Sequence, residues 1–83
     1  MKQKKVNIGG VEYTLQKPLP REYIQMRERC KGPAGFSEEK YYTEILQNVV
    51  VDPQCSIDDF EDYADLEALM QEAVQFLHGR STQ

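Results

Sequence analysis

The sequence predicts a small α+β domain in which an N-terminal β-hairpin packs on a bundle of three helices, in the order ββααα. Residues 5–15 alternate apolar and polar side chains around a Gly-Gly pair, which is typical of a hairpin. Two later segments repeat apolar residues at helical spacing. A chain of 83 residues makes at most one domain, with a thin core. We therefore expect a single domain over residues 1–79 and a frayed tail at residues 80–83.

The hairpin is the clearest local signal. Gly9 and Gly10 provide the positive φ angles that a two-residue turn requires. This turn pairs Ile8 with Val11, so that the apolar side chains of both strands lie on one face. They are Val6, Ile8, Val11, Tyr13 and Leu15. Because an isolated hairpin is barely stable in water, we expect this face to be buried on the second and third helices.

The first helix is expected over about residues 20–30. It follows a stiff KPLP link, and Pro20 suits the start of a helix. Its expected buried side chains are Tyr23, Ile24 and Cys30. The segment KGPAGF, at residues 31–36, contains two glycines and a proline, which cannot continue the helix.

The second helix is expected over about residues 38–50. Ser37 suits the N-cap, and Glu38 and Glu39 place anions in the first turn. One apolar stripe is formed by Tyr42, Ile45, Leu46, Val49 and Val50. The Asp52-Pro53 pair is expected to end the helix.

The third helix is expected over about residues 64–78, with Gly79 as its C-cap. Its apolar stripe is formed by Leu66, Leu69, Met70, Ala73, Val74 and Leu77. An acidic loop at residues 54–65 precedes it, in which Ser56 and Asp59 have the spacing that caps a single turn.

The charge of the chain is unevenly distributed. Residues 1–31 carry eight Lys or Arg against three Glu, or +5, and residues 32–83 carry two against eleven Asp or Glu, or −9. Because residues 32–83 are so acidic, nucleic acid is not expected as a partner. The opposite charges also motivate a hypothesis of weak, salt-sensitive self-association. The alternative is a monomer in which the charges neutralise each other within one fold.

The sequence gives no sign of export or of a membrane span. The N-terminus is basic but lacks an apolar segment, and no apolar run approaches the ~20 residues that a transmembrane helix needs. We therefore expect a cytoplasmic protein with no membrane partner. In that compartment Cys30 and Cys55 are expected to be reduced thiols.

No residue pattern predicts catalysis, a metal or a cofactor. His78 stands in the last turn of the third helix, where a surface or capping role is expected. The acidic tract around Phe60 lacks the glycine and the ligand spacing of a calcium loop. Cys30 and Cys55 lack the spacing of a zinc site. We therefore expect a protein that is not an enzyme and that acts by binding other proteins.

Three aromatic residues lie outside the apolar stripes: Phe36, Tyr41 and Phe60. They either close the ends of the core or contact a partner. Phe60 stands among four acidic residues, and an apolar anchor inside a charged ring is the usual composition of a binding hot spot. We predict all three as partner-binding residues.

The segments IGGVEYTLQKP and VVVDP, followed after three residues by IDDFED, together resemble a known family. They look like the tail assembly chaperones of long-tailed bacteriophages and prophages, of the type found in Gram-positive hosts. The resemblance covers roughly residues 5–79 and implies a non-catalytic role in the host cytoplasm. Members bind the tape-measure protein, keep its long helix soluble and help to recruit tail-tube subunits. Many exist in a short and a frameshifted longer form, and this chain resembles the short one.

The sequence is compatible with two classes of function. The first is a chaperone whose helical client docks across the second and third helices, near Phe36, Tyr41 and Phe60. The second is a small DNA-associated regulatory or antirepressor module, which the helical content allows. The −9 charge of residues 32–83 and the lack of a basic recognition helix argue against the second class.

Overall fold

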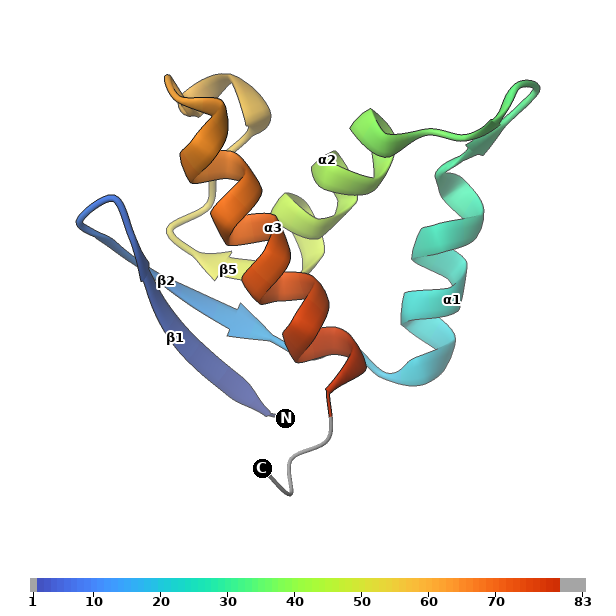
Figure 1. Cartoon of the computed structure of the whole chain (residues 1–83). Helices are drawn as coiled ribbons and strands as arrows, with labels where there is room; N and C mark the ends of the chain where they lie inside the picture. The colour runs from blue at the N-terminus through green and yellow to red at the C-terminus, as the bar shows by residue number, and fades with distance from the viewer. Residues whose placement is uncertain (1, 80–83) are drawn as a thin grey trace.

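The computed structural model describes residues 2–79 (Figure 1). Its elements are β1 (Gln3–Ile8), β2 (Val11–Gln16), α1 (Pro20–Arg29), β3 (Lys31–Gly32), β4 (Gly35–Phe36), α2 (Glu38–Asn48), β5 (Val50–Asp52), the 3-10 turn η1 (Ile57–Asp59) and α3 (Tyr63–His78). One antiparallel sheet has the strand order β1-β2-β5, and β3 and β4 form a separate small hairpin. The predicted α+β class is confirmed.

The N-terminal hairpin has the predicted register. Ile8 pairs with Val11, and Gly9 and Gly10 have φ angles of 59° and 86°, as the two-residue turn requires. A Cβ atom on Gly9 would lie 3.0 Å from a carboxylate oxygen of Asp65. The turn is therefore in close contact with the first turn of α3.

Most of the predicted apolar face of the hairpin is buried. The buried side chains are Val6, Tyr13 and Leu15, and Ile8 is partly buried. Val11, however, is 43% exposed, so its predicted burial is wrong. It directly follows the Gly9-Gly10 turn, in the last residue pair of the hairpin.

The hairpin lies mainly against α3, which packs on β1. An ion pair between Lys4 and Glu72, with 3.4 Å between nitrogen and oxygen, joins the same two elements. α2 reaches the sheet chiefly through β5 rather than through the hairpin face itself. The prediction that both helices cover this face is thus correct for α3 and needs correction for α2.

The third strand, β5, was not expected from the sequence. α2 ends at Asn48 rather than at residue 50, and the chain then pairs with β2, with Val50 opposite Leu15. Both of these side chains are fully buried. Val50, which continues the apolar stripe of the helix, is therefore part of a strand, and sheet pairing buries it in the core.

The first helix is placed as predicted, but its buried side is different. α1 buries Met26, and Cys30 directly follows it in the core, whereas Ile24 is 59% exposed. The predicted burial of Ile24 is wrong because two residues correspond to roughly 200° around a helix, so Ile24 and Met26 face nearly opposite ways. The break expected at residues 31–36 is the tight β3–β4 hairpin.

The predicted caps are present. The side chain of Ser37 accepts a hydrogen bond from the backbone N–H of Lys40 at 3.3 Å. The backbone N–H of Ser56 donates to the Asp59 carboxylate at 2.8 Å and closes the η1 turn. Gly79 ends α3 and donates to the carbonyl of Gln75 at 2.7 Å, although its backbone is extended rather than left-handed.

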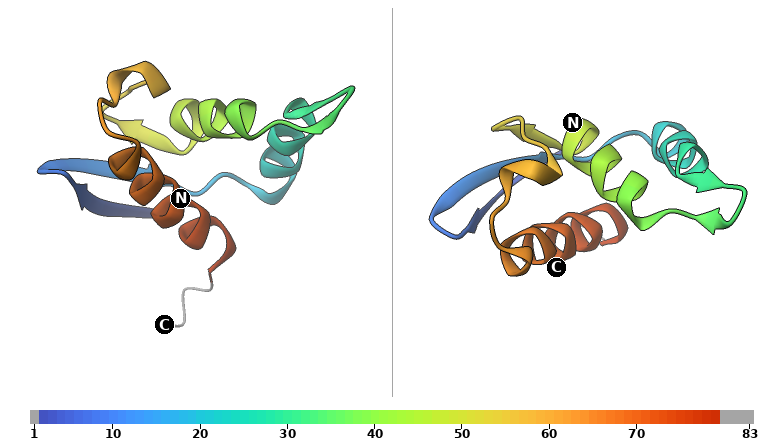
Figure 2. Two further views of the ribbon diagram at one scale, coloured as in Figure 1. Left: turned by 45° about the horizontal axis from the view of Figure 1, so that its top comes forward. Right: turned by 90° about the horizontal axis from the view of Figure 1, so that it is seen from above.

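Figure 2 shows that α1 and the β3–β4 hairpin lie at one end of the molecule and the β1–β2 hairpin at the other. Within residues 2–79, no strand pairs with the outer edge of β1. No helix in this part of the chain is both long enough and apolar enough to cross a membrane. The tail predicted at residues 80–83 lies outside the described residues.

Candidate functional site

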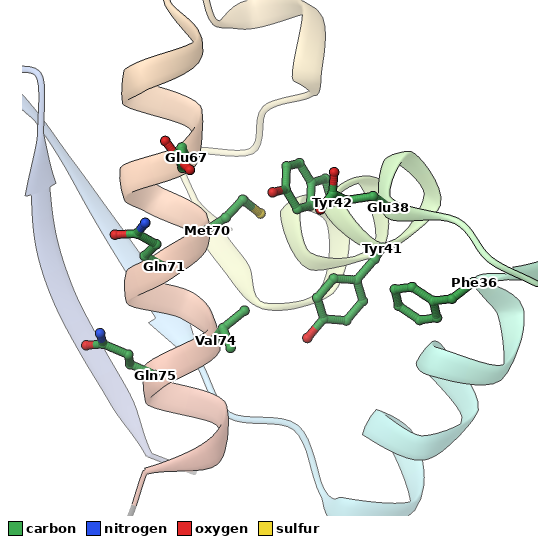
Figure 3. A pocket seen from close by; sticks show the side chains of 9 residues that line it. All are labelled: Phe36, Glu38, Tyr41, Tyr42, Glu67, Met70, Gln71, Val74 and Gln75. Atoms are coloured by element: carbon green, nitrogen blue, oxygen red, sulfur yellow. The ribbon is translucent and has the colours of Figure 1, made fainter.

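An open groove of about 590 Å³ lies between α2 and α3 (Figure 3). It is lined by Phe36, Glu38, Tyr41, Tyr42, Glu67, Met70, Gln71, Val74 and Gln75. In Figure 3, Met70 and Val74 point from α3 toward the two tyrosines of α2. The groove thus has an apolar, partly aromatic floor and a polar rim.

The helical repeat explains why these residues meet. Residues 67, 70, 71 and 74 of α3 are three or four positions apart and therefore share one face. That face lies beside the core stripe, and Met70 belongs to both, since it is only 3% exposed and forms part of the core. On α2, Tyr41 and Tyr42 lie one turn before Ile45 and Leu46, which pack inward.

Phe36 and Tyr41 form one wall of the groove. Their ring centroids are 5.3 Å apart with an interplanar angle of 57°. Phe36 is 48% exposed, and the guanidinium of Arg27 lies 5.7 Å from the centre of its ring. The small β3–β4 hairpin therefore presents an exposed aromatic ring at the groove, with a cation from α1 beside it.

A chain of hydrogen bonds connects Tyr41 in this wall to α1 and α3. The hydroxyls of Tyr41 and Tyr23 are 2.8 Å apart, and the Tyr23 hydroxyl is 2.8 Å from Nε2 of His78. Tyr23 can donate to His78 while it accepts from Tyr41, so one consistent arrangement joins α2, α1 and α3. Burial raises the pKa of Tyr41 above its usual range, and its hydrogen bond to Tyr23 raises the pKa further.

His78 therefore has a structural partner that the sequence did not reveal. Tyr23 and His78 are 55 positions apart, and their rings also meet edge to face at 5.5 Å. Nothing in the local pattern around either residue indicates this contact.

The rim of the groove carries two carboxylates, Glu38 on α2 and Glu67 on α3. Burial raises the pKa of the Tyr42 phenol, and the charge of Glu38, the interaction with Tyr63 and the charge of Glu67 raise it further, in that order. Within the described residues, no cationic side chain lies within ion-pairing distance of either carboxylate. This side of the groove is therefore a site of negative potential next to an apolar floor.

Phe60, the third predicted partner-binding residue, lies elsewhere. Its ring stacks on Tyr13 of the hairpin, with 6.2 Å between centroids and 18° between planes. It is partly buried against the core, and the four acidic residues around it are exposed. The structure thus brings Phe36 and Tyr41 together and gives Phe60 a packing role at the end of the core.

The two cysteine thiols are the remaining chemically reactive groups, and both are at least partly buried. The Cys30 thiol is buried and donates to the carbonyl of Met26 at 3.2 Å, and burial raises its pKa, which keeps it protonated. Cys55 is a second free thiol, partly buried, and burial raises its pKa as well. Among residues 2–79, no group of three or more His, Cys, Asp or Glu side chains is placed to hold a metal ion.

Comparison of the chain with models of protein families, with curated proteins and with solved structures found no match in any of the three.

Proposed function

We propose that this chain is a non-catalytic tail assembly chaperone of a long-tailed bacteriophage or prophage. In this proposal it binds a helical segment of the tape-measure protein in the groove between α2 and α3 and helps to recruit tail-tube subunits. The proposal rests on the resemblance of residues 5–79 to that family and on one structural observation. That observation is the open apolar groove with an exposed aromatic wall.

The groove has the properties that a helical client requires. An amphipathic helix docks by placing side chains at i, i+3, i+4 and i+7 in an apolar groove. Phe36 is exposed, while Tyr41, Tyr42 and Val74 are partly buried, so each of them has surface left for a partner to cover. Aromatic side chains at the centre of an interface contribute a large share of binding energy.

The charge of the molecule supports a protein partner over DNA. α3 is the longest helix in the described part of the chain, and it carries Asp65, Glu67 and Glu72 but no Lys or Arg. A recognition helix needs cations for the phosphates around it. The groove rim is acidic as well, so neither surface suits a regulatory module that acts on DNA.

Co-expression with a tape-measure fragment from the same phage or prophage tests the proposal. The wild-type chain should keep the fragment in the soluble fraction and co-purify with it. The double variant Phe36→Ala/Val74→Ala should lose both properties while its circular dichroism spectrum stays that of the wild type. It removes apolar surface from the groove at one exposed and one partly buried position.

The matched control is Leu19→Ala/Ile24→Ala. These side chains are 58% and 59% exposed and do not line the groove, so the control removes apolar surface elsewhere. It should solubilise the fragment as well as the wild type does. A folded Phe36→Ala/Val74→Ala variant that still solubilises the fragment would contradict the proposed site.

A further inference from the structure

The acidic rim of the groove comes from two different helices. Glu38 is the first residue of α2 and Glu67 is the fifth residue of α3, yet both border the same opening (Figure 3). The ion pairs among the described residues use other carboxylates: Glu28, Glu44 and Glu72. Two exposed carboxylates without a cation therefore stand at the mouth of an apolar groove.

The surroundings of this rim suit one type of side chain. Tyr42 lines the same groove as the two carboxylates. Met70 and Val74 continue the apolar surface below them. A lysine or arginine has an apolar stem and a cationic head, so it can cover the partly buried Val74 and Tyr42 while its charge meets Glu38 and Glu67. The face of a tyrosine ring also attracts a cation.

One cation lies close to the groove. Arg27 lies over the ring of Phe36, 5.7 Å from its centre, whereas Glu38 and Glu67 stand at the rim. A cation on a bound helix is therefore attracted by the two carboxylates and repelled near Arg27. This difference gives the groove a preferred orientation for a charged occupant.

From this arrangement we infer that the groove selects an amphipathic helix in which a lysine or arginine lies next to the apolar anchors and enters between Glu38 and Glu67. The inference rests on the proposed function, because it names the chemistry of the client segment that the groove accepts. It adds a requirement that an apolar groove alone does not impose, namely a basic residue at a fixed place beside the anchors.

Two synthetic amphipathic peptides test this requirement. Both carry leucine at the same i, i+3, i+4 and i+7 positions, and the flanking polar positions are lysine in one and glutamate in the other. Binding is measured by fluorescence anisotropy at low and high salt. The wild-type protein should bind the lysine peptide roughly tenfold more tightly at low salt, because only that peptide forms ion pairs with Glu38 and Glu67. The preference should shrink at high salt.

The variant Glu38→Gln/Glu67→Gln should bind both peptides with nearly equal affinity. The net charge of the protein, −4, favours the lysine peptide wherever it binds, so a control of equal charge is needed. Glu12→Gln/Glu61→Gln removes two exposed carboxylates outside the groove and should keep the tenfold preference. In nuclear magnetic resonance spectra, the lysine peptide should shift the methyl signals of Met70 and Val74.

Three results would overturn the inference. If Glu38→Gln/Glu67→Gln keeps the preference while Phe36→Ala/Val74→Ala loses both peptides, the groove binds helices without selecting charge, and the proposed function stands. If Phe36→Ala/Val74→Ala binds both peptides as the wild type does, the docking site and the inference fail together. If the protein alone sediments as an oligomer that Glu38→Gln/Glu67→Gln converts to a monomer, the occupant is a second copy of this chain.

Discussion

The two ends of the molecule are held together by different kinds of contact. At the sheet end, α3 packs on β1 and α2 packs on β5. The core there includes Leu15, Val50 and Leu69, each fully buried. At the other end, α1 contributes Met26 and the partly buried Tyr23 to the core and also makes polar contacts. Tyr23 bonds to Tyr41 and His78, and the exposed ion pair of Arg29 with Glu44 spans 2.8 Å.

This difference has a consequence for stability along the chain. Apolar burial depends little on pH or salt, whereas hydrogen bonds between ionisable groups and exposed ion pairs depend on both. Segments with few buried apolar contacts also open at lower free energy than the core does. We therefore expect α1 with the β3–β4 hairpin to open locally before the sheet end unfolds, and the wall of the groove to change with it.

The largest expected effect is at the sheet end. Leu46 is 1% exposed in the core that α2 shares with β5, so Leu46→Ala should lower the free energy of unfolding by about 2–5 kcal/mol. The loss should appear in one cooperative transition in urea, seen equally by fluorescence and circular dichroism. Ile8→Ala, at a partly buried position, should cost less. Equal, negligible losses for both variants would refute the packing described for the sheet end.

Truncation in α1 should act locally instead. Met26 is 2% exposed, and Met26→Ala should cost about 2–4 kcal/mol. Amide hydrogen exchange should show that α1 loses most of its protection while β1, β2 and α3 keep theirs. A uniform loss of protection across all elements would mean that the two ends form a single cooperative unit. The exposed neighbour Ile24 provides the control, since Ile24→Ala should leave exchange in α1 unchanged.

Alkaline pH should release α1 before it unfolds the rest. The pKa of Tyr41 is raised in the folded protein, by burial first and then by the hydrogen bond to Tyr23. Above about pH 10, the usual pKa of tyrosine, the unfolded state has lost a proton that the folded state still holds, so the free energy of unfolding falls as pH rises. Below that pH the contribution of Tyr41 is fully present.

Two measurements detect the opening of α1 at alkaline pH: amide hydrogen exchange, extrapolated to high pH, and the absorbance of tyrosinate. The signal of Tyr41 should appear later than that of an exposed tyrosine and together with the loss of α1 protection. In Tyr41→Phe, α1 should be less sensitive to alkali. If tyrosinate forms at the ordinary pKa while α1 stays protected, the raised pKa of Tyr41 does not contribute to the attachment of α1.

A smaller effect is expected for Tyr23→Phe, which removes one hydroxyl and with it the bonds to Tyr41 and His78. The opening free energy of α1 should fall by roughly 1 kcal/mol, the net value of a typical hydrogen bond. The exchange rates of β1 and β2 should not change. An α1 as protected as in the wild type would show that apolar contacts alone hold it in place.

The smallest effect is expected for the ion pair. Arg29→Gln should weaken the attachment of α1 only slightly, because both partners are exposed to some degree at the surface. The difference from the wild type should be measurable at low salt and disappear at high salt. A loss that persists at high salt would point to a packing role of the Arg29 side chain.

The elements that could be predicted from sequence are those with a strong local signal. The register of the hairpin follows from Gly9-Gly10 and the alternation around it. β5 could not be predicted, because Val50 continues the apolar stripe of α2 and only its pairing with the distant Leu15 makes it part of a strand. Ile24 was assigned to the core in error because α1 has many charged residues and only a weak apolar face.

Part of the candidate site could also be predicted, because two of its residues have a local signal in the sequence. Phe36 and Tyr41 stand out because they lie off the apolar stripes, and the structure brings them together at the groove. Phe60 has the same local pattern, yet it packs on Tyr13, and a contact across 47 positions leaves no local trace. The shared role of Glu38 and Glu67 likewise depends on how α2 and α3 cross.

The open edge of β1 explains the position of the N-terminal lysines. Backbone N–H and C=O groups on an unpaired edge are a template on which another strand can assemble, which is a common start of aggregation. Lys2, Lys4 and Lys5 lie along this edge, and Lys4 is anchored by Glu72. Two copies that meet edge to edge place these like charges against each other. Lysine side chains on an edge strand disfavour such pairing, so we expect the basic N-terminus to hinder edge-to-edge growth of the sheet.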